Sequence, residues 1–481
     1  MEQGSLVESG SDHDMSMQIE FLGAARQVTG SRYVVHAGGL RLMIDCGLFQ
    51  ERAYVERNWA CCPVPAGGLD AVLLTHAHLD HTGLLPRLMQ EGYAGPIHAT
   101  PPSIDLTRII LEDAAEIQEE DAAYKRKRHE REGRRGRFPE TPLYTRADAR
   151  AVLPLLKPVG YGQRLVLNDS VTATWHDAGH ILGSAMIEVG VREGARERVV
   201  VFSGDLGQPD RVLLKDPTFL RRADALVMES TYGDRDHRHD GDVRARLAEL
   251  IRETTSGGGN LLIPTFAVER AQELAYHLAR LAREKAIPDV PVYLDSPMAA
   301  EVLDVFRRHR TFLDAEALRL LHEGEPLFDF PGFRIVTTQK DSKEINRVRG
   351  CVILAGSGMC TAGRIKHHLA RNIGDPLCTI CFTGYQAEGT LGREILDGNS
   401  PVRIHGELFE VRARVTQVSG LSAHADRKGL LTWSGKYAPP PRKVFLTHGE
   451  LSAARSLAEE LRRAGVGEVV IPEYGSRHAA Y

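Results

Sequence analysis

Four side chains that can bind a metal ion lie within six residues of one another: His76, His78, Asp80 and His81. They follow the apolar run 71–74, which is typical of a strand. His76 and His78 are two positions apart, so an extended backbone points both imidazoles in the same direction. Asp80 and His81 come where the chain turns into a predicted helix, and they can face a second point nearby. Such a set of nitrogen and oxygen ligands favours a site for two metal ions, and zinc in particular.

Three more groups suited to a metal site lie at the ends of predicted strands. Asp45 follows one apolar strand, His180 follows another in the motif D-A-G-H, and Asp205 follows a third in S-G-D. Loops at one end of a sheet converge on the same cleft, so we expect these groups beside His76. The simplest role for Asp45 is to orient a metal ligand or a metal-bound water molecule.

Three further titratable groups have equivalent positions later in the chain. Glu229 follows the apolar run 225–228, His448 follows 444–446, and His424 comes after another strand-rich stretch. Residues placed in this way are expected in a cleft. Taken alone, however, a histidine such as His424 is more often a surface residue than a catalytic one.

The first group of motifs resembles the ordered motifs of the metallo-β-lactamase superfamily. The matching segments are I-D-C-G at 44–47, H-A-H-L-D-H at 76–81, D-A-G-H at 177–180 and S-G-D at 203–205. The resemblance implies two zinc sites that share Asp205 as a bridge. One site would contain His76, His78 and His180, and the other would contain Asp80 and His81. Two zinc ions can share a hydroxide, lower its pKa, and hold the attacking and leaving oxygens of a phosphodiester.

The three later groups resemble the extra motifs of the β-CASP nucleases, in the order Glu229, His424 and His448. The segment between them also resembles the β-CASP domain, with I-P-T-F-A at 263–267, G-S-G-M at 356–359 and G-Y-Q-A at 384–387. The resemblance covers about 18–471 and is closest to the bacterial and archaeal relatives of the polyadenylation-factor endonuclease. Relatives that act on DNA usually lack a histidine at the last motif, so His448 favours RNA as the substrate.

The resemblance also implies a role for each of these groups. His448 would complete the second zinc site. His424 would protonate the leaving ribose oxygen as a general acid, and Glu229 would orient His424. A carboxylate beside an imidazole raises its pKa and fixes its tautomer, as a proton donor near neutral pH requires. Asp80 and Asp45 are counted with the catalytic residues because they would hold or orient the metal centre.

Contacts to the RNA backbone are predicted in the inserted segment. The loop 357–361, which begins at Ser357, precedes a predicted helix and is a candidate for presenting backbone N–H groups to a phosphate. Arg270 and Arg364 are candidates for adding positive charge there. Each arginine is equally well explained as a surface residue or a helix cap.

The elements around these motifs predict an α/β fold. Strands dominate 17–224, short apolar strands alternate with amphipathic helices in 225–398, and strand signals return in 399–481. We therefore expect a metallo-β-lactamase αββα sandwich, formed by 17–224 and 399–481, with an inserted β-CASP α/β domain and a mostly parallel sheet at 225–398. Residues 1–16 are polar and acidic and are expected to form a disordered tail.

The composition narrows the class of protein. An apolar fraction of 42% with 26% charged residues is typical of a soluble globular protein, and the sequence has no apolar run long enough to span a membrane. Seven cysteines, an odd number, argue against a disulfide framework and for the reducing cytoplasm. Cys378 and Cys381 have the C-x2-C spacing of some zinc sites, but a strand would send residues three apart to opposite faces. The net charge of −4 means that RNA phosphates must meet locally positive groups.

One charge pattern has two interpretations. The segment 112–121 is acidic, whereas 125–137 carries eight Lys or Arg residues and two acids. Such blocks are ordinarily the solvated surface of a helix, but the basic block also suits an arm that contacts RNA. The sequence leaves both interpretations open.

The leading hypothesis is therefore zinc-dependent endonucleolytic cleavage of single-stranded RNA, with 5′ exonucleolytic trimming as a further activity. A small-ester or thioester hydrolase would also use the metal ligands, but it would leave the insertion and Glu229, His424 and His448 without a role. A catalytically inactive RNA-binding paralogue would be expected to lose ligands, and this sequence retains all of them. The oligomeric state is not fixed by the sequence, and a homodimer is one possibility.

Overall fold

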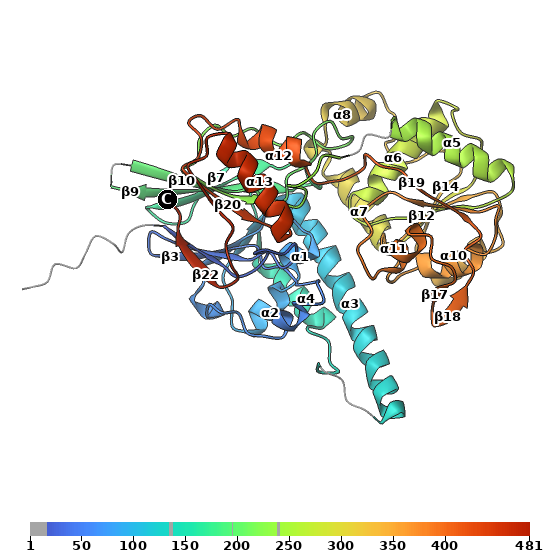
Figure 1. Cartoon of the computed structure of the whole chain (residues 1–481), viewed down its shortest axis with the longest axis horizontal. Helices are drawn as coiled ribbons and strands as arrows, with labels where there is room; N and C mark the ends of the chain where they lie inside the picture. The colour runs from blue at the N-terminus through green and yellow to red at the C-terminus, as the bar shows by residue number, and fades with distance from the viewer. Residues whose placement is uncertain (1–16, 134–137, 195, 238–240) are drawn as a thin grey trace, which may run out of the picture.

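The computed structural model describes residues 17–133, 138–194, 196–237 and 241–481. Two bodies lie side by side, each built around β-sheet, and the long helix α3 (Pro101–Glu132) runs along the border between them (Figure 1). Among the described residues, no helix has both the length and the apolar character that a membrane crossing needs.

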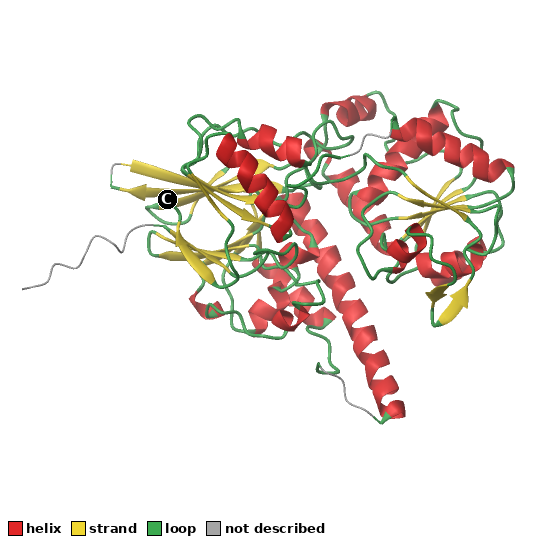
Figure 2. Ribbon diagram, in the orientation of Figure 1, coloured by secondary structure: helices red, strands yellow, loops and turns green. Residues whose placement is uncertain are grey.

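The first body contains two seven-stranded sheets that face each other (Figure 2). The order of the first sheet is β22 (Ser476–Ala479), β1 (Gln18–Phe21), β2 (Tyr33–Ala37), β3 (Leu40–Ile44), β4 (Ala71–Leu73), β5 (Ile97–Ala99) and β6 (Leu156–Pro158). The order of the second is β21 (Glu468–Val470), β20 (Lys443–Thr447), β11 (Ala225–Glu229), β10 (Arg196–Phe202), β9 (Ala185–Glu193), β8 (Val171–Asp177) and β7 (Arg164–Val166). One apolar core fills the space between the sheets and includes Phe21, Trp175 and Phe445.

Helices cover the outer face of each sheet, so this body is an αββα sandwich as predicted. Leu85 and Leu111 pack with the outward-facing residues of the first sheet, and Leu430 and Leu457 pack with those of the second. The helices on the first side are α1 (Leu79–Thr82), α2 (Leu85–Gln90), the start of α3, and α4 (Arg146–Val152). Those on the second side are α12 (Arg427–Ser434) and α13 (Leu451–Arg463).

The second body is an α/β domain with a fully parallel sheet of six strands. The order is β14 (Phe333–Val336), β13 (Val292–Asp295), β15 (Val352–Ala355), β12 (Leu261–Pro264), β16 (Thr379–Phe382) and β19 (Arg414–Gln417). Its helices are α5 (Val243–Ser256), α6 (Arg270–Arg283), α7 (Pro297–Arg308), α8 (Ala315–His322), α9 (Gln339–Ile345), α10 (Ile365–Asn372) and α11 (Leu391–Leu396). A short hairpin of β17 (Val402–Ile404) and β18 (Glu407–Phe409) completes it.

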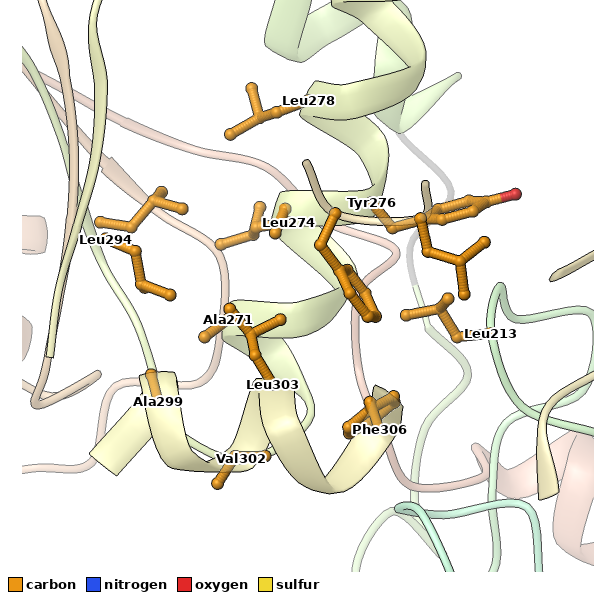
Figure 3. Close-up of a cluster of buried hydrophobic side chains, with 14 of the residues drawn as sticks. Leu213, Ala271, Leu274, Tyr276, Leu278, Leu294, Ala299, Val302, Leu303 and Phe306 are labelled. Carbon is orange, nitrogen blue, oxygen red and sulfur yellow. The ribbon is translucent and has the colours of Figure 1, made fainter. Parts of the chain in front are cut away.

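Separate apolar clusters cover the two faces of the parallel sheet. On one face, Leu274 of α6 and Leu303 of α7 meet Leu294 of β13 (Figure 3). On the other face, helices α10 and α11 pack against the sheet. Cys378 and Cys381 belong to these opposite clusters, so the two thiols do not form a shared metal site.

The strand pairing differs from the expected division of the chain at two points. Strand β11 begins at residue 225, where the insertion was expected to start, yet it pairs with β10 and β20 of the sandwich. Strand β19 lies after residue 399, where the sandwich was expected to resume, yet it pairs with β16 of the parallel sheet. The physical reason is that an apolar run predicts a buried strand without specifying which strand will be its neighbour.

Candidate metal centre

The candidate site residues lie in loops at the carboxyl ends of the sandwich strands. His76 and His78 follow β4, His180 follows β8, and Asp205 follows β10. Asp45 follows β3, Glu229 is the last residue of β11, and His448 follows β20. Both sheets therefore supply residues to one edge of the sandwich, beside the α/β domain.

Four ligand atoms form a first group. They are His76 Nε2, His78 Nδ1, His180 Nε2 and Asp205 Oδ2, all within 4.8 Å of one another. His78 Nδ1 is 3.1 Å from His76 Nε2 and 3.2 Å from His180 Nε2. Asp205 Oδ2 is 3.4 Å from His76 Nε2 and 3.5 Å from His180 Nε2.

A second group lies on the other side of Asp205. Its Oδ1 atom is 3.3 Å from His81 Nε2 and 3.4 Å from His448 Nε2. His448 Nε2 is also 3.3 Å from Asp80 Oδ2. Each carboxylate oxygen of Asp205 thus faces a different set of ligands.

The hydroxyl of Thr75 and the carboxylate of Asp45 are both buried. They fix the orientation of the His76 and His81 imidazoles. His81 Nδ1 donates to Asp45 Oδ2 at 2.7 Å, and Thr75 Oγ1 donates to the same oxygen at 2.8 Å. Because the hydroxyl proton of Thr75 is used in this way, its oxygen accepts from His76 Nδ1 at 3.1 Å. Both Nε2 atoms are left with a lone pair that points toward Asp205, as expected for metal ligands with a supporting shell.

Thr231 supports His448 in the same way. Its hydroxyl donates to the backbone carbonyl of His448 at 2.9 Å, and its oxygen accepts from His448 Nδ1 at 3.1 Å. Sequence reasoning missed both Thr75, which directly precedes His76, and Thr231, which is two residues after Glu229. A hydroxyl near an identified residue was the available signal, and it is too common to interpret without the fold.

The electrostatics of the two groups favour a cation. His81 Nε2 and Asp205 Oδ1 are buried and have no hydrogen-bond partner, so when His81 is neutral an imidazole lone pair faces a carboxylate oxygen across 3.3 Å. Such an arrangement costs free energy unless positive charge lies between the atoms. Burial disfavours the charged form of His81, yet Asp205 and Asp45 outweigh it and hold its pKa well above the usual value.

The histidines of the first group keep their lone pairs at neutral pH. Burial lowers the pKa of His76 to about 4 and that of His78 to about 3, and it holds the pKa of His180 well below its usual value. Neutral imidazole is the form that binds metal ions. The first group is therefore ready to accept a metal ion without releasing protons.

A glycine allows the Asp80 loop to approach the preceding strand. A Cβ atom on Gly47 would lie 1.6 Å from the carbonyl oxygen of Asp80. Any other residue at the end of the I-D-C-G motif would displace this loop, and with it the Asp80 and His81 ligands.

His424 lies beside the two ligand groups and is held by Glu229. Its Nδ1 atom donates to the Glu229 carboxylate, at 3.2 and 3.1 Å from the two oxygens, and its Nε2 atom is 3.9 Å from Asp205 Oδ2. Glu229 is 1% exposed. Burial opposes protonation of His424, but Glu229 and Asp205 outweigh it and raise the pKa of this imidazole.

Two residues that sequence reasoning did not identify support His424. His237 Nε2 donates to the backbone carbonyl of His424 at 2.9 Å, and the backbone N–H of His237 donates to Asp426 at 3.0 Å. The ring of Tyr232 lies 6.2 Å from the His424 ring. Tyr232 belongs to the same E-S-T-Y-G segment as Glu229, so its position in the sequence was an available signal.

The three predicted phosphate-binding residues all belong to the α/β domain. Arg364 Nη1 forms an ion pair of 2.5 Å with Asp295, so its charge is already neutralised. Arg270 is 7% exposed and lies 3.6 Å from Glu273, and burial lowers its pKa. Ser357 lies in an exposed loop, where its hydroxyl and that of Thr361 are 3.3 Å apart.

A buried ion cluster joins the loop of His180 to the α/β domain. Arg211 Nη1 donates to the backbone carbonyl of His180 at 3.0 Å, and Arg211 Nη2 donates to Glu273 of α6 at 3.2 Å. The carboxylate of Glu269 accepts from the backbone N–H of Leu182 at 3.3 Å. The position of one candidate ligand is thus coupled to the second domain.

Three family models match most of the chain. Residues 26–259 match the metallo-β-lactamase superfamily, and residues 271–395 match the Beta-Casp domain. Residues 409–472 match the Zn-dependent metallo-hydrolase RNA specificity domain. These three matches agree with the order of motifs along the sequence.

Curated relatives match over nearly the same span. Ribonuclease TTHA0252 of Thermus thermophilus is 40% identical over 460 residues, which are 95% of this chain and 99% of the relative. Transcription termination factor FttA of Methanocaldococcus jannaschii is 33% identical over 95% of this chain and 71% of the relative. FttA of Methanosarcina mazei is 32% identical over 93% of this chain and 69% of the relative.

A solved structure supports the fold independently. A protein of unknown function from Enterococcus faecalis superposes with a TM-score of 0.53 at 12% identity, covering 96% of this chain and all of the other. At that identity the likeness concerns the fold alone. Together with the family models and the curated relatives, it leads to one conclusion: the chain belongs to the β-CASP family of metallo-β-lactamase-fold RNA nucleases.

Proposed function

We propose that this chain cuts single-stranded RNA with two zinc ions bound at the Asp205 cluster. The observation that carries the proposal is that the two oxygens of Asp205 face two separate groups of ligand atoms. A tetrahedral zinc ion with bonds of about 2.0–2.1 Å needs ligand atoms about 3.3 Å apart. The separations of 3.1 to 3.5 Å in both groups fit this requirement.

The proposed ligands divide between the two ions. His76, His78 and His180 would hold the first, Asp80, His81 and His448 would hold the second, and Asp205 would bridge them. When bound, such a pair of ions supplies an activated water molecule and neutralises the charge of the phosphate. Asp45 keeps His81 oriented, because it accepts the proton on the nitrogen that faces away from the metal.

His424 is the residue that we assign to proton transfer. Its Nδ1 proton is held by Glu229, so its Nε2 atom is the one that can face a substrate oxygen. A raised pKa favours the protonated imidazole near neutral pH, as donation to a leaving ribose oxygen requires. After each turnover the imidazole would regain its proton from solvent, and the Glu229 carboxylate would stabilise the charged form.

The proposal covers endonucleolytic cleavage, with 5′ exonucleolytic trimming as a further activity. The metal-hydrolase match at 409–472, described as an RNA specificity domain, supports RNA as the substrate. The seven free cysteines suit a cytoplasmic location, which stays a prediction, as does a homodimer.

The test is metal-dependent cleavage of two labelled RNAs, one linear and one circular. We expect chelation to abolish cleavage of both and zinc to restore it, with about two zinc ions bound per chain at full activity. Cleavage of the circular RNA demonstrates endonuclease activity because that substrate has no end. Cleavage that persists in chelator, or a zinc-loaded protein that cuts neither RNA, would refute the proposed function.

A further inference from the structure

The long helix α3 changes character along its length. Its first part packs against both bodies: Arg108 pairs with Glu301 of α7 at 3.5 Å, and Glu112 pairs with Arg150 of α4 at 3.3 Å. Glu116 pairs with Arg146 of α4 at 3.4 Å. The acidic block of the helix is therefore used to attach it to neighbouring elements.

The distal part of α3, from Tyr124 to its end, extends beyond both bodies (Figure 1). Tyr124 is 65% exposed, and every residue from Lys125 to Arg128 is exposed. Residues 124–132 contain five Lys or Arg side chains and two carboxylates, which leaves three net positive charges in a protein whose overall charge is −4.

Most of these cations have no acidic partner. Arg128 pairs with Glu132 at 2.8 Å. Within the described part of the chain, no carboxylate lies within ion-pair distance of Lys125, Arg126, Lys127 or Arg131. In the proximal helix, by contrast, Arg108, Glu112 and Glu116 each pair with an oppositely charged residue of a neighbouring element.

Helix stability does not explain the basic cluster. Cations in the last turn are stabilised by the helix dipole, but Lys125, Arg126 and Lys127 come before that turn. Like charges four residues apart, such as Lys127 and Arg131, destabilise a helix slightly. The cluster therefore has a small cost in stability, and among the described residues only the Arg128–Glu132 ion pair offsets it.

The exposed face of the distal helix carries an aromatic ring and several positive charges. Tyr124, Lys127, Arg128 and Arg131 follow the i, i+3, i+4 and i+7 spacing, so they share one side of the helix. An aromatic ring beside cations is the pattern of a surface that binds single-stranded nucleic acid, because a base stacks on the ring and phosphates meet the cations.

The helix also connects this surface to the metal centre. At its start, the hydroxyls of Thr100 and Ser103 donate to the carbonyl of Gly183, at 2.6 and 2.9 Å, three residues after His180. From Pro101 to Lys125 the helix rises about 36 Å, a distance that about eleven nucleotides of a stacked strand would span at 3.4 Å each.

We propose that the Tyr124–Arg131 face of α3 is a second RNA-binding site, which holds single-stranded RNA at a distance from the cut. The inference rests on the proposed function, because it takes RNA as the substrate. It assigns phosphate contacts to Lys127, Arg128 and Arg131 and base stacking to Tyr124. The site serves long RNAs and has no role for RNAs too short to reach it.

The first experiment neutralises this face with Lys127→Gln, Arg128→Gln and Arg131→Gln. Glutamine keeps helix propensity, and circular dichroism checks that the helix is retained. Binding of a labelled single-stranded RNA of about thirty nucleotides, in the His424→Ala background so that the RNA stays intact, should weaken about tenfold or more at about 0.1 M salt. The slope of log affinity against log salt should fall by about 2, since each lost contact to a single strand removes about 0.7.

The control neutralises three exposed arginines at the far side of the sandwich, Arg196, Arg462 and Arg463. This variant has the same net charge and should bind the long RNA as the parent does. A second variant, Tyr124→Leu, keeps all the charges and should lose about fivefold or more in affinity without a change in salt slope.

Cleavage separates this inference from the proposed function. In the active protein, the neutralised variant should raise KM for the long RNA and leave kcat and cleavage of an RNA of about six nucleotides unchanged, since the short RNA spans about 20 Å. An unchanged affinity and salt slope for the long RNA, with the helix intact, would overturn the inference in favour of a protein-docking surface. An equal loss in the control variant would overturn it as well. Failure of the proposed function would instead appear as absent cleavage of both RNAs.

Discussion

Two buried aspartates lie at strand ends, one in each body, and both have histidine neighbours. They differ in whether hydrogen-bond donors reach their carboxylate oxygens. Asp205 follows β10 of the sandwich and Asp295 is the last residue of β13 in the parallel sheet, and both are at most 2% exposed. Each is beside histidine. Asp295 accepts from Arg364 at 2.5 Å, Ser342 at 2.6 Å and His368 at 2.7 Å, so both of its oxygens are satisfied.

Asp205 has no such donors. Its oxygens lie 3.3 to 3.5 Å from four histidine nitrogens, and Oδ1 has no hydrogen-bond partner. A direct hydrogen bond closes the gap between two groups to less than about 3 Å, whereas a shared cation holds its ligand atoms farther apart. Residue type therefore does not distinguish a structural cluster from a metal site, but the distances and the missing donors do.

The largest expected effect comes from Asp205→Asn. The amide nitrogen cannot bind a cation, so the bridge between the two ligand groups is lost. We expect RNA cleavage to fall by more than the roughly 10⁴-fold that a general acid contributes, together with loss of bound zinc. Elemental analysis measures the bound zinc, and a cleavage assay on the same preparation measures the activity. A variant that keeps two zinc ions and a percent of its activity would contradict the assignment.

The next effect separates proton transfer from metal binding. His424→Ala should lower kcat about 10²- to 10⁴-fold and leave the zinc content unchanged. Glu229→Gln, which keeps an acceptor for His424 Nδ1, should lower kcat by less. If His424→Ala lost zinc along with activity, His424 would be a ligand and another residue would have to serve as the acid.

A smaller effect is expected at Asp45, which contacts a ligand and no metal ion. Asp45→Asn weakens the hydrogen bond that fixes His81 and should reduce zinc affinity or activity about 10- to 100-fold. Titration with a competing chelator measures the affinity. The second ligand group should weaken more than the first, because Asp45 contacts His81 directly and His76 only through Thr75, so one of the two zinc ions should be lost at a lower chelator concentration. Equal loss of both ions would mean that Asp45 acts on the whole fold.

Much of the metal centre could be predicted from the sequence because its ligands lie at strand ends. The spacing of His76 and His78 specifies a common direction on an extended backbone, and Asp205 follows a clear apolar strand. The structure brings these residues together with His448, which is more than 360 positions away from His76. Local pattern places each of these groups at a strand end, and the family resemblance is what assigns them to one metal centre.

What could not be predicted depends on which strands become neighbours. The apolar run of β11 is equally suited to the sandwich or to the parallel sheet, and only its pairing with β10 and β20 assigns it to the sandwich. The ion pair of Arg364 with Asp295 could not be predicted either, because the two residues are 69 positions apart. The supporting roles of Thr75 and Thr231 likewise require distances that no single-sequence pattern contains.

The smallest expected effect on activity completes the comparison. Asp295→Ala leaves the buried His368 and the Arg364 guanidinium without their partner, and breaking such a buried pair typically costs about 3–5 kcal/mol of the free energy of unfolding. The Tm measured by circular dichroism should therefore fall, while zinc content and kcat below the transition stay as in the parent. Asp205→Asn should show the reverse pattern, with loss of zinc and of kcat but a smaller fall in the zinc-free Tm, because Asp205 Oδ1 has no hydrogen-bond partner that the substitution would leave unsatisfied. A zinc-free Asp205→Asn variant as unstable as Asp295→Ala would show that Asp205 has a structural role like that of Asp295.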